Sequence, residues 1–373
     1  MRILYIAEAR LPNQRANSIH VMRMCRSMAL LGHQVRLLAF KHSTFRNKAD
    51  VYKYYGVDPI FDIKLIKSPG TGRLSSFWLG LMSWFEVLRT RPDLVYSRSL
   101  IAAYLAPAKR GNLVFESHSF LLRLVYKWQK TFFRSILAKK SLNGVVVISD
   151  ALKQLYVDSG IQPDVFFVAH DGADECSLKE TAQLQGDYPV NVGYFGSIYN
   201  GRGIEKIIAM ALARPKVGFH LFGAHESDMG HFDKIPHNFH FYGFITPSQV
   251  YKYRNSCDIL LAPYQKEVFV STKQTYSTSL YMSPLKIFEY MSSGKAIMVS
   301  DMPVLREIFD DQNAVLVPPE DEKAWIAGLD KLVDDEAFRE SIGRNALKKF
   351  LEHYTWDIRA KRILSWIENR SNK

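Results

Sequence analysis

The sequence lacks the features that define several classes of protein. Only 3 of its 373 residues are cysteines, and they lie far apart at Cys25, Cys176 and Cys257, which excludes a disulfide framework and a CxxC metal site. No apolar stretch approaches the ~18 residues of a membrane-spanning helix, and the longest, Phe77 to Phe85, runs into a glutamate. The chain starts with a strand-like run and no signal-peptide core. We therefore expect a cytoplasmic protein that does not span a membrane.

Acidic residues are scarce in one part of the chain. Its net charge is +12, and residues 1–150 alone contain 24 lysines and arginines against 8 aspartates and glutamates. Such an excess attracts an anionic partner, which can be lipid or nucleic acid. No nucleic-acid motif is present, and the cations alternate with large aliphatic residues, so we expect an anionic membrane surface and no nucleic acid as partner.

The chain contains a large supply of apolar residues in a repeating order. Short β-branched runs alternate with segments of helix length, which predicts two α/β halves with parallel sheets covered on both faces. The predicted strands are 3–7, 35–40, 94–96, 113–115, 145–148 and 165–168, then 192–195, 218–222, 239–242, 259–262, 296–299 and 314–317. We predict an N-terminal domain over 1–174, a polar linker over 175–189, a C-terminal domain over 190–354 and a last helix over 355–373.

Two turns after predicted strands have the character of ligand sites. Ala9–Ser18 is a polar loop that ends in the cap-like Asn17 and Ser18 before a helix, and a helix N-terminus after a strand is a natural ligand crevice. It lacks GxGxxG, so a dinucleotide is not indicated. Gly193–Gly203 has four glycines in eleven residues and Arg202 between two of them, which favours a phosphate site. The alternative for Ala9–Ser18 is an ordinary connection between a strand and a helix, and the alternative for Gly193–Gly203 is a flexible surface turn.

The segment Ser283–Glu307 is the most informative in the chain. Pro284 is placed to start a helix, with Lys286 in its first turn and Glu289 three residues later. A cation in the first turn opposes the helix dipole, which is easier to explain when an anion binds there. Glu289 on the same side can accept hydrogen bonds from vicinal hydroxyls such as those of a ribose. A surface Lys–Glu pair is the alternative.

Residues 115–140 contain a second group of candidates. FESHS over Phe115–Ser119 places His118 at a predicted strand end, where an imidazole can act as an acid, a base or a hydroxyl-binding group, or be structural. Phe120–Lys140 then interleaves bulky apolar residues with six cations, as an interfacial amphipathic helix does. A core helix with a solvated basic face is the alternative, and the basic excess favours the membrane surface.

These segments resemble the glycosyltransferases of family 4, which have the GT-B fold. SPLKIFEYMSSGKAIMVSDMPVLRE is similar to the family's donor-nucleotide signature. Seven more segments agree in order and spacing, and together they cover nearly the whole chain: ANSIHVMRMCRSMALLGHQV, RPDLVYSRS, FESHS, VVVISDALKQLYVDSGI, VAHDGAD, VGYFGSIYNGRGIEKII and CDILLAPY.

The resemblance implies two Rossmann-like domains that face each other across a cleft, with a last helix that crosses back to the N-terminal domain. The donor is then held mainly by the C-terminal domain and the acceptor by the N-terminal one. Arg202 and Lys286 would neutralise the diphosphate, Glu289 would bind the ribose, and His118 would act near the transferred sugar. The other implied positions are Gly196, Ser197, Gly223, Phe244, Ser283, Pro284 and Leu285 for the donor, and Asn17, His20, Arg98 and His118 for the acceptor.

The sequence departs from the family pattern in three regions. Family members often carry a second glutamate eight residues before the one matched by Glu289, and Tyr281 occupies that position here. The carboxylate of this missing glutamate would have to come from another residue, for example from Glu267. In the glycine-rich turn Ser197 replaces a frequent cation, and Ala16–Asn17 replaces a common glycine pair. The diphosphate site then depends on the two remaining cations.

The expected reaction is the retaining transfer of a hexose from a nucleotide sugar to a saccharide or lipid-linked acceptor, in surface polysaccharide or glycolipid synthesis at the inner face of a membrane. We expect no metal and no cofactor, because cations and helix N–H groups can stabilise the charge on a leaving diphosphate. No DxD follows a predicted strand. A nucleotide-sugar epimerase or hydrolase on the same fold and a basic nucleic-acid-binding protein are the alternatives.

Overall fold

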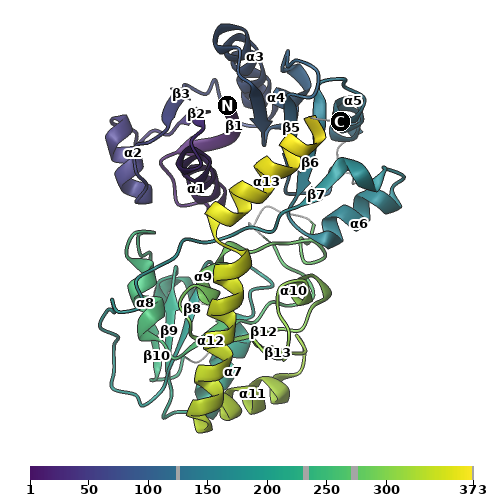
Figure 1. Ribbon diagram of the computed structural model, residues 1–373. Coiled ribbons are helices and arrows are strands. Elements are labelled where there is room, and N and C mark those ends of the chain that lie inside the picture. The colour runs from purple at the N-terminus through teal and green to yellow at the C-terminus, as the bar shows by residue number, and fades with distance from the viewer. Residues whose placement is uncertain (123–126, 230–234, 270–275, 372–373) are drawn as a thin grey trace. The chain divides into compact units, whose positions relative to one another are not determined.

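The computed structural model describes residues 1–122, 127–229, 235–269 and 276–371, which form two compact units. The first unit comprises Met1–Asp171 and Trp356–Lys373, and the second comprises Gly172–Thr355. Each unit has its own sheet and its own helices (Figure 1). Among the described residues every pairing between named strands is parallel, which confirms the expected pair of α/β domains.

In the sheet of the first unit the strand order reverses between β1 (Arg2–Leu11) and β4 (Leu94–Ser97). The seven strands of this sheet are, in spatial order, β3 (Asp62–Ile66), β2 (Gln34–Lys41), β1, β4, β5 (Leu113–Ser117), β6 (Leu142–Val147) and β7 (Phe166–Val168). The chain builds outward from β1 to β3 and then returns to add β4 on the other side of β1. Ligands bind to sheets of this kind at the carboxyl ends of the strands beside the reversal.

The edge strand β3 is the strand that the hydrophobic pattern missed. In its sequence DIKLI only Ile63 is fully buried, while Asp62 and Lys64 are partly exposed. Asp62 is paired with Arg36 of β2 and with Lys48. An edge strand has solvent along one side, so it does not produce the continuous apolar run that the central strands show.

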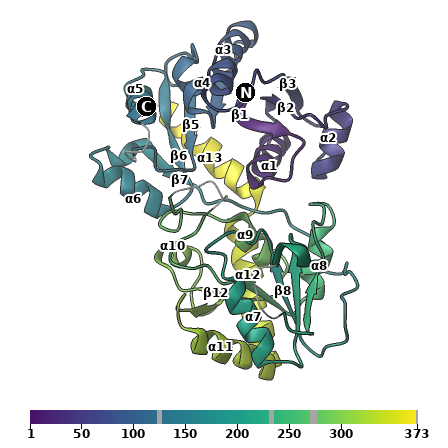
Figure 2. The same ribbon diagram turned by 180° about the vertical axis from the view of Figure 1, so that it is seen from behind.

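The helices of the first unit include one from the end of the chain. They are α1 (Ala16–Leu30), α2 (Lys48–Tyr55), α3 (Arg73–Thr90), α4 (Leu100–Leu105), α5 (Lys127–Leu137), α6 (Asp150–Asp158) and α13 (Trp356–Ser371). The last of them lies beside α1 in both views (Figure 1; Figure 2). It also packs on β6, where a Cβ at Gly144 would lie only 2.3 Å from the ring of Trp366. This docking agrees with the expected return of the last helix to the N-terminal domain.

The loop predicted over Ala9–Ser18 is shorter in the structure. Strand β1 continues to Leu11 and α1 begins at Ala16, so Asn17 and Ser18 lie inside the first turn instead of capping it. Arg15 is the N-cap residue and makes no side-chain cap hydrogen bond. The hydroxyl of Ser18 instead donates 2.7 Å to the carbonyl of Arg15. The side chain of Ser18 therefore connects the first turn of α1 to the residue before the helix.

The second unit repeats the doubly wound scheme with six strands. In spatial order they are β10 (Phe239–Phe241), β9 (Gly218–Phe222), β8 (Asn191–Phe195), β11 (Ile259–Ala262), β12 (Ala296–Ser300) and β13 (Val315–Val317). Its helices are α7 (Ile204–Ala213), α8 (Val250–Ser256), α9 (Leu285–Met291), α10 (Pro303–Arg306), α11 (Glu322–Asp334) and α12 (Glu336–His353). A buried core joins α7, α11 and the sheet around the fully buried Trp325. The strand order reverses between β8 and β11.

The segment Phe120–Lys140 is described only in part, and Arg123 lies outside the described residues. Helix α5 buries Phe133 and Ile136 and exposes Lys127 and Arg134. The two buried side chains therefore belong to the core and not to a membrane-inserting face. Within the part of the chain that the structure describes, no helix is both long enough and apolar enough to cross a bilayer.

Candidate functional site

Three of the proposed acceptor residues follow neighbouring strands of the first sheet. Arg98 comes directly after β4, His118 directly after β5, and Asn17 lies in the first turn of the helix that follows β1. Because β1, β4 and β5 are adjacent and parallel, their carboxyl ends meet at one edge of the sheet. The contacts agree, since Nη1 of Arg98 donates to the carbonyl of Asn17 over 3.4 Å.

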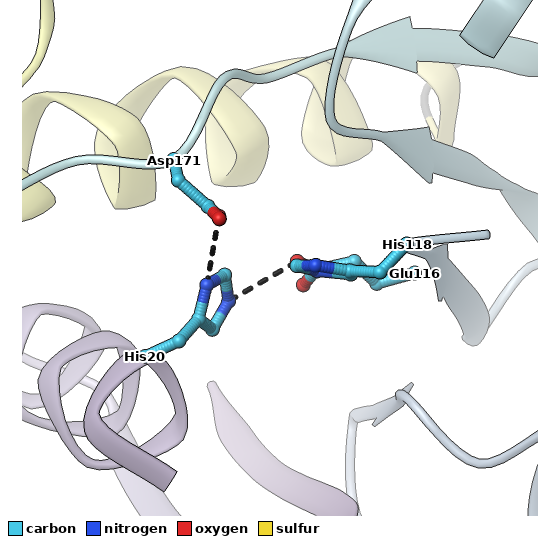
Figure 3. A group of neighbouring side chains, drawn as sticks. All are labelled: His20, Glu116, His118 and Asp171. Carbon is cyan, nitrogen blue, oxygen red and sulfur yellow. Dashed lines mark hydrogen bonds and ion pairs between the residues drawn. The ribbon is translucent and has the colours of Figure 1, made fainter. Parts of the chain in front are cut away.

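Glu116 is the centre of a buried polar cluster at this edge (Figure 3). Its Oε1 lies 2.5 Å from Nε2 of His118, 2.9 Å from Nη2 of Arg359 and 3.1 Å from Nε2 of His20. Its Oε2 accepts a hydrogen bond from the hydroxyl of Tyr96. Burial alone would raise the pKa of Glu116, but the charges of Arg359 and the histidines outweigh it and hold this pKa well below its usual value.

His20 connects Glu116 to a second buried carboxylate. Figure 3 shows its ring between Asp171 and Glu116, and Nδ1 lies 2.9 Å from Oδ1 of Asp171. Burial acts to raise the pKa of Asp171, yet His20 and the nearby charges lower it to about 2. The ring also contacts those of His118 and Trp356 edge-on, with centroids 5.0 Å apart. His20 thus lies between two buried carboxylates and beside two aromatic rings inside the unit.

His118 is the histidine of this cluster that a ligand can reach. Its side chain is 25% exposed, whereas those of His20 and Glu116 are 1% and 0% exposed. Burial and the charge of Arg98 lower the pKa of His118 to about 4, although Glu116 opposes the shift. The imidazole is therefore neutral at pH 7, with Nε2 held by Glu116 and a quarter of the side chain exposed.

The cluster also has the donor set of a cation site. Ligand atoms of His20, Glu116, His118 and Asp171 all lie within 4.8 Å of one another, so these residues could hold a metal ion. A guanidinium already fills this role, because Nη2 of Arg359 lies 2.9 Å from Glu116 and 4.0 Å from Asp171. Nη2 also donates to the carbonyl of Ala169, while Nε donates to the carbonyl of His170 and Nη1 to the sulfur of Met24.

Sequence reasoning missed three members of this cluster. Glu116 stands two residues before His118, and this period-two spacing places both on one face of a strand, which is a signal that could have identified it. Asp171 follows the last strand of the unit, as candidate residues do elsewhere in the sheet. Arg359 comes from α13, 243 residues after Glu116. No local pattern predicts that pairing, since it depends on where the last helix docks.

In the second unit, two glycine turns follow β8 and β9 and pack against each other. The amide of Gly196 donates to the carbonyl of Phe222 over 2.9 Å. Both Gly196 and Gly223 have positive φ, at 142° and 107°, and a Cβ on Gly223 would lie 2.6 Å from the carbonyl oxygen of Gly196. Larger residues would therefore separate the turns. Ser197 continues the first turn, and its carbonyl accepts 2.7 Å from the hydroxyl of Tyr194.

The rest of the glycine-rich turn is packed as tightly. A Cβ at Gly201 or Gly203 would overlap the carbonyl oxygens of Glu267 and Pro263, at 1.8 Å and 1.9 Å. Gly203, with φ of 72°, is the N-cap residue of α7. The turn is therefore a fixed structure that presents the N-terminus of a ten-residue helix. The side chain of Glu267 is exposed, and its backbone supports the turn.

Lys286 is a buried cation without a hydrogen bond to any described residue. Its Nζ lies 4.0 Å from the ring centroid of Tyr194 and 5.5 Å from that of Tyr264, and a Cβ at Gly196 would be 2.8 Å away. Burial and the charge of Arg202 lower the pKa of Lys286 well below its ordinary value, while Glu289 opposes this. The amino group lies against the glycine turn and is unsatisfied there.

Arg202 approaches the same tyrosine. Its guanidinium carbon lies 5.4 Å from the ring centroid of Tyr264, and its buried Nε has no hydrogen-bond partner within the described ranges. Burial raises the pKa of Tyr264 to about 12, so the phenol stays neutral beside the two cations. The structure thus brings Arg202, Lys286 and Gly196 together. Their spacing along the chain does not by itself predict this.

Glu289 lies one turn after Lys286 on α9 and has a partner that the sequence did not suggest. Its Oε2 lies 3.3 Å from Nη1 of Arg254, which comes from α8. The arginine side chain is nearly buried at 6% exposure, whereas that of Glu289 is 29% exposed. The buried partner therefore holds the carboxylate while part of it stays open to a ligand.

The remaining donor positions surround the start of α9 or lie in a separate loop. Ser283 is buried, Pro284 is the N-cap residue of α9, and Leu285 is its first residue. Phe244 follows β10 and is 43% exposed. Tyr281, at the place of the expected second glutamate, is buried.

Sequence comparisons match both halves of the chain. The family model described as Glycosyltransferase Family 4 matches residues 18–175, and the one described as Glycosyl transferase-like matches residues 202–365. An uncharacterized glycosyltransferase of Methanocaldococcus jannaschii is 25% identical over 225 residues, which are 58% of this chain and 53% of that protein. The match thus spans about half the length of this curated relative.

Solved structures share the fold over nearly the full length. Sucrose-phosphate synthase from Thermosynechococcus elongatus has a TM-score of 0.73 at 14% identity, covering 99% of this chain and 98% of that one. Anabaena HepE in complex with UDP and glucose has a TM-score of 0.68 at 16% identity, covering 99% of both chains. At these identities the likeness shows the GT-B fold alone. The two family matches show that the chain is a glycosyltransferase, and that its N-terminal half belongs to glycosyltransferase family 4.

Proposed function

We propose that this protein transfers a hexose from a nucleotide-sugar donor to a saccharide or lipid-linked acceptor with retention at the anomeric carbon. The observation that carries the proposal is the meeting of Lys286 and Arg202 beside the glycine turn, each with a buried nitrogen that finds no hydrogen-bond partner in the described residues. A diphosphate supplies the charged oxygens that such nitrogens bind strongly. It also compensates the repulsion between the two cations.

The same residues suit the chemical step. When the bond from the anomeric carbon to the diphosphate breaks, negative charge develops on the leaving oxygen. Lys286, Arg202 and the first N–H groups of α7 are fixed positive elements in a position to stabilise it. We therefore propose a reaction that needs no metal ion, in which the protein itself supplies the positive charge.

Glu289 and His118 complete the proposed roles. Glu289 accepts hydrogen bonds from the donor ribose, with Arg254 orienting the carboxylate from behind. His118, neutral and partly exposed in the first unit, binds or moves a proton at a hydroxyl of the transferred sugar. Since Anabaena HepE has been crystallised with UDP and glucose, a uridine diphosphate sugar is the first donor to test.

The proposal also includes the acceptor and the location of the enzyme at a membrane surface. The basic first unit supports a peripheral association with an anionic membrane, which a lipid-linked acceptor would require. Surface polysaccharide and glycolipid synthesis both involve such acceptors.

The donor site is tested by thermal shift with UDP, GDP, ADP and their sugar conjugates, since a ligand that binds only the folded state raises its stability. One nucleotide should stabilise the wild type, and Glu289→Ala should remove that shift. Glu322→Ala, at an exposed acid in the first turn of α11, is the matched control and should leave it intact. If no nucleotide shifts the folded wild type, or if Glu289→Ala responds fully, the donor site is wrong.

The reaction itself is tested by product analysis. Incubation of the identified donor with saccharide and lipid-linked acceptors should give a glycoside whose anomeric configuration, read by NMR, matches that of the donor. EDTA should leave the rate unchanged. Release of free or epimerised sugar at the same rate without any acceptor would instead indicate a hydrolase or epimerase.

A further inference from the structure

Helix α3 has the reverse of the usual polarity. Its buried face consists mostly of small or polar residues: Ser75, Gly80, Ser83 and Glu86, with Leu79 and Val87. Its exposed face is a stripe of large apolar side chains at positions spaced three and four apart: Leu74, Phe77, Trp78, Leu81, Trp84 and Phe85, continued by Leu88. Helices on the surface of soluble domains place these two sets the other way round. We call this exposed stripe the α3 face.

The inward orientation of the polar side is fixed by an ionic contact. The carboxylate of Glu86 is buried and lies 3.0 Å from Nη1 of Arg36, 2.5 Å from Nζ of Lys64 and 2.6 Å from Nη2 of Arg89. Burial would raise the pKa of Glu86, but these three cations lower it to about 2. Rotating the helix to bury its apolar stripe would break the contacts with Arg36 of β2 and Lys64 of β3. The exposure of the α3 face is therefore built into the unit.

Close packing on the neighbouring helix supports the same orientation. A Cβ at Gly80 would lie 2.8 Å from Cδ1 of Leu105 and 3.1 Å from Cγ2 of Ile101, so the glycine leaves room for these two side chains of α4. The two helices lie next to each other in both views (Figure 1; Figure 2). The contact uses the buried side of α3 and leaves its apolar stripe outward.

Aromatic side chains extend the α3 face onto α4 and α5. The ring of Phe132 lies 6.2 Å from Phe77, 4.6 Å from Tyr104 and 5.9 Å from Trp128, measured between centroids. The guanidinium of Arg73, at the start of α3, lies 5.4 Å from the centroid of Trp128. The apolar surface is thus continuous across three helices, and a cation is already seated on it.

Cations surround this surface and acids are scarce there. Lys127 and Arg134 are exposed on α5, and Arg91 is exposed just after α3. Between residues 94 and 149 the sequence has a single acidic residue, Glu116, and it is buried in the polar cluster. An apolar stripe with such a rim is complementary to an anionic bilayer, where cations meet headgroups and aromatic side chains enter the interface. A second copy of this chain would bring the same positive charge against it, which disfavours a dimer.

We propose that the α3 face is the surface by which this protein docks onto an anionic lipid bilayer, with α3 lying in the plane of the interface. At 1.5 Å per residue the stripe from Leu74 to Leu88 is about 21 Å long. The inference rests on the membrane association proposed above and assigns it to α3, with α5 contributing its basic rim. It does not depend on the identity of the donor.

The test measures binding to vesicles with two matched triple variants. Leu74→Gln, Leu81→Gln and Leu88→Gln together change the α3 face at leucines that are 42% to 63% exposed. Leu30→Gln, Leu212→Gln and Leu351→Gln make the same chemical change at helical leucines outside it that are 43% to 50% exposed. The probes are vesicles of phosphatidylcholine with phosphatidylglycerol and vesicles of phosphatidylcholine alone, with co-sedimentation at low and high salt.

We expect the wild type to bind the anionic vesicles, the α3 variant to bind about tenfold or more weakly, and the control variant to bind like the wild type. Quenching by brominated lipid provides a second measurement that needs no disruptive substitution. It should be strong in the wild type and should decrease in Trp78→Phe, Trp84→Phe, because these are the tryptophans of the α3 face.

The other outcomes overturn the inference in distinguishable ways. If the wild type binds anionic vesicles and the α3 variant binds equally well, the docking surface lies elsewhere while membrane association stands. If the wild type binds no anionic vesicle, the proposed membrane association fails as well, and the donor assay above still tests glycosyl transfer separately. If the wild type is a dimer that the α3 variant converts to a monomer without affecting lipid binding, a second copy covers the α3 face.

Discussion

Replacing Lys286 by methionine should change stability and ligand binding in opposite directions. The two side chains have similar length and shape, so the substitution removes the amino group and little else. A buried donor without a partner costs about 1–3 kcal/mol, and Nζ of Lys286 has none within the described residues. Its contact with the ring of Tyr194 at 4.0 Å recovers about 0.5–2 kcal/mol of this. The nucleotide-free variant should therefore be more stable by about 1 kcal/mol.

The sign of the pH dependence follows from the lowered pKa. An unfolded lysine titrates near pH ~10.4, while burial lowers the pKa of Lys286 well below that value. As pH falls through this interval, the unfolded chain takes up a proton that the folded state resists, so the wild type loses stability relative to the variant. The difference between the two proteins should therefore be larger at pH 7 than at pH 10, and it should level off below the folded-state pKa.

Nucleotide affinity should move the other way. A charge-assisted hydrogen bond to a phosphate is worth about 1.5–3 kcal/mol, so Lys286→Met should weaken nucleotide binding by about 10- to 150-fold. Denaturant titration and calorimetry with the nucleotide identified by thermal shift measure the two effects. The matched control is Lys323→Met, which changes an exposed lysine at the second position of α11, as Lys286 is at the second position of α9.

One combination of results would refute this reasoning. If Lys286→Met is less stable than the wild type and binds the nucleotide with unchanged affinity, the lysine is a structural cation and the diphosphate lies elsewhere. Lys323→Met should show neither effect, so a change there would indicate a general response to lost charge.

Three further predictions concern other parts of the two units. Arg359→Met should destabilise the protein by about 3–5 kcal/mol in denaturant titration, because it leaves the buried carboxylate of Glu116 without its strongest partner; an unchanged midpoint would contradict this. His118→Asn should lower the transfer rate by about 10²- to 10⁴-fold with little effect on donor binding. Since the wild-type pKa is about 4, the wild-type rate should be level from pH ~6 to ~8 and fall only as the imidazole gains a proton near pH 4. Gly203→Ala should lower the melting temperature sharply, because its Cβ would lie 1.9 Å from the carbonyl oxygen of Pro263 at a φ of 72°; a melting temperature equal to that of the wild type would show that the turn adjusts.

The sequence predicted the central strands and missed what depends on position in the sheet. Central parallel strands are apolar on both faces, so runs such as Val145–Val147 identify them directly. The edge strand Asp62–Ile66 pairs its charged residues with neighbours and gives no such run. The polarity of α3 was also hidden, because a stripe of Leu, Phe and Trp at helical spacing reads as a core face. Its outward direction is set by cations from other strands that bind Glu86.

For the candidate site, local spacing identified groups and long-range contacts supplied their partners. The sequence places Lys286 and Glu289 on one helix, and a glycine-rich turn around Arg202. It does not show that both cations converge on Tyr264, or that Arg254 from another helix holds Glu289. These contacts join residues far apart in the chain, and a single sequence carries no signal for them.

The docking of α13 has a consequence for how the chain is made. A ribosome completes the strands of the first unit long before it reaches Arg359, and until then Glu116 and Asp171 have no guanidinium between them. The first unit cannot therefore reach its final, fully compensated interior as an independent N-terminal domain, although such domains usually fold first during synthesis. Its maturation waits for the translation of the entire second unit, so a nascent chain halted before α13 should stay loosely packed and open to proteases.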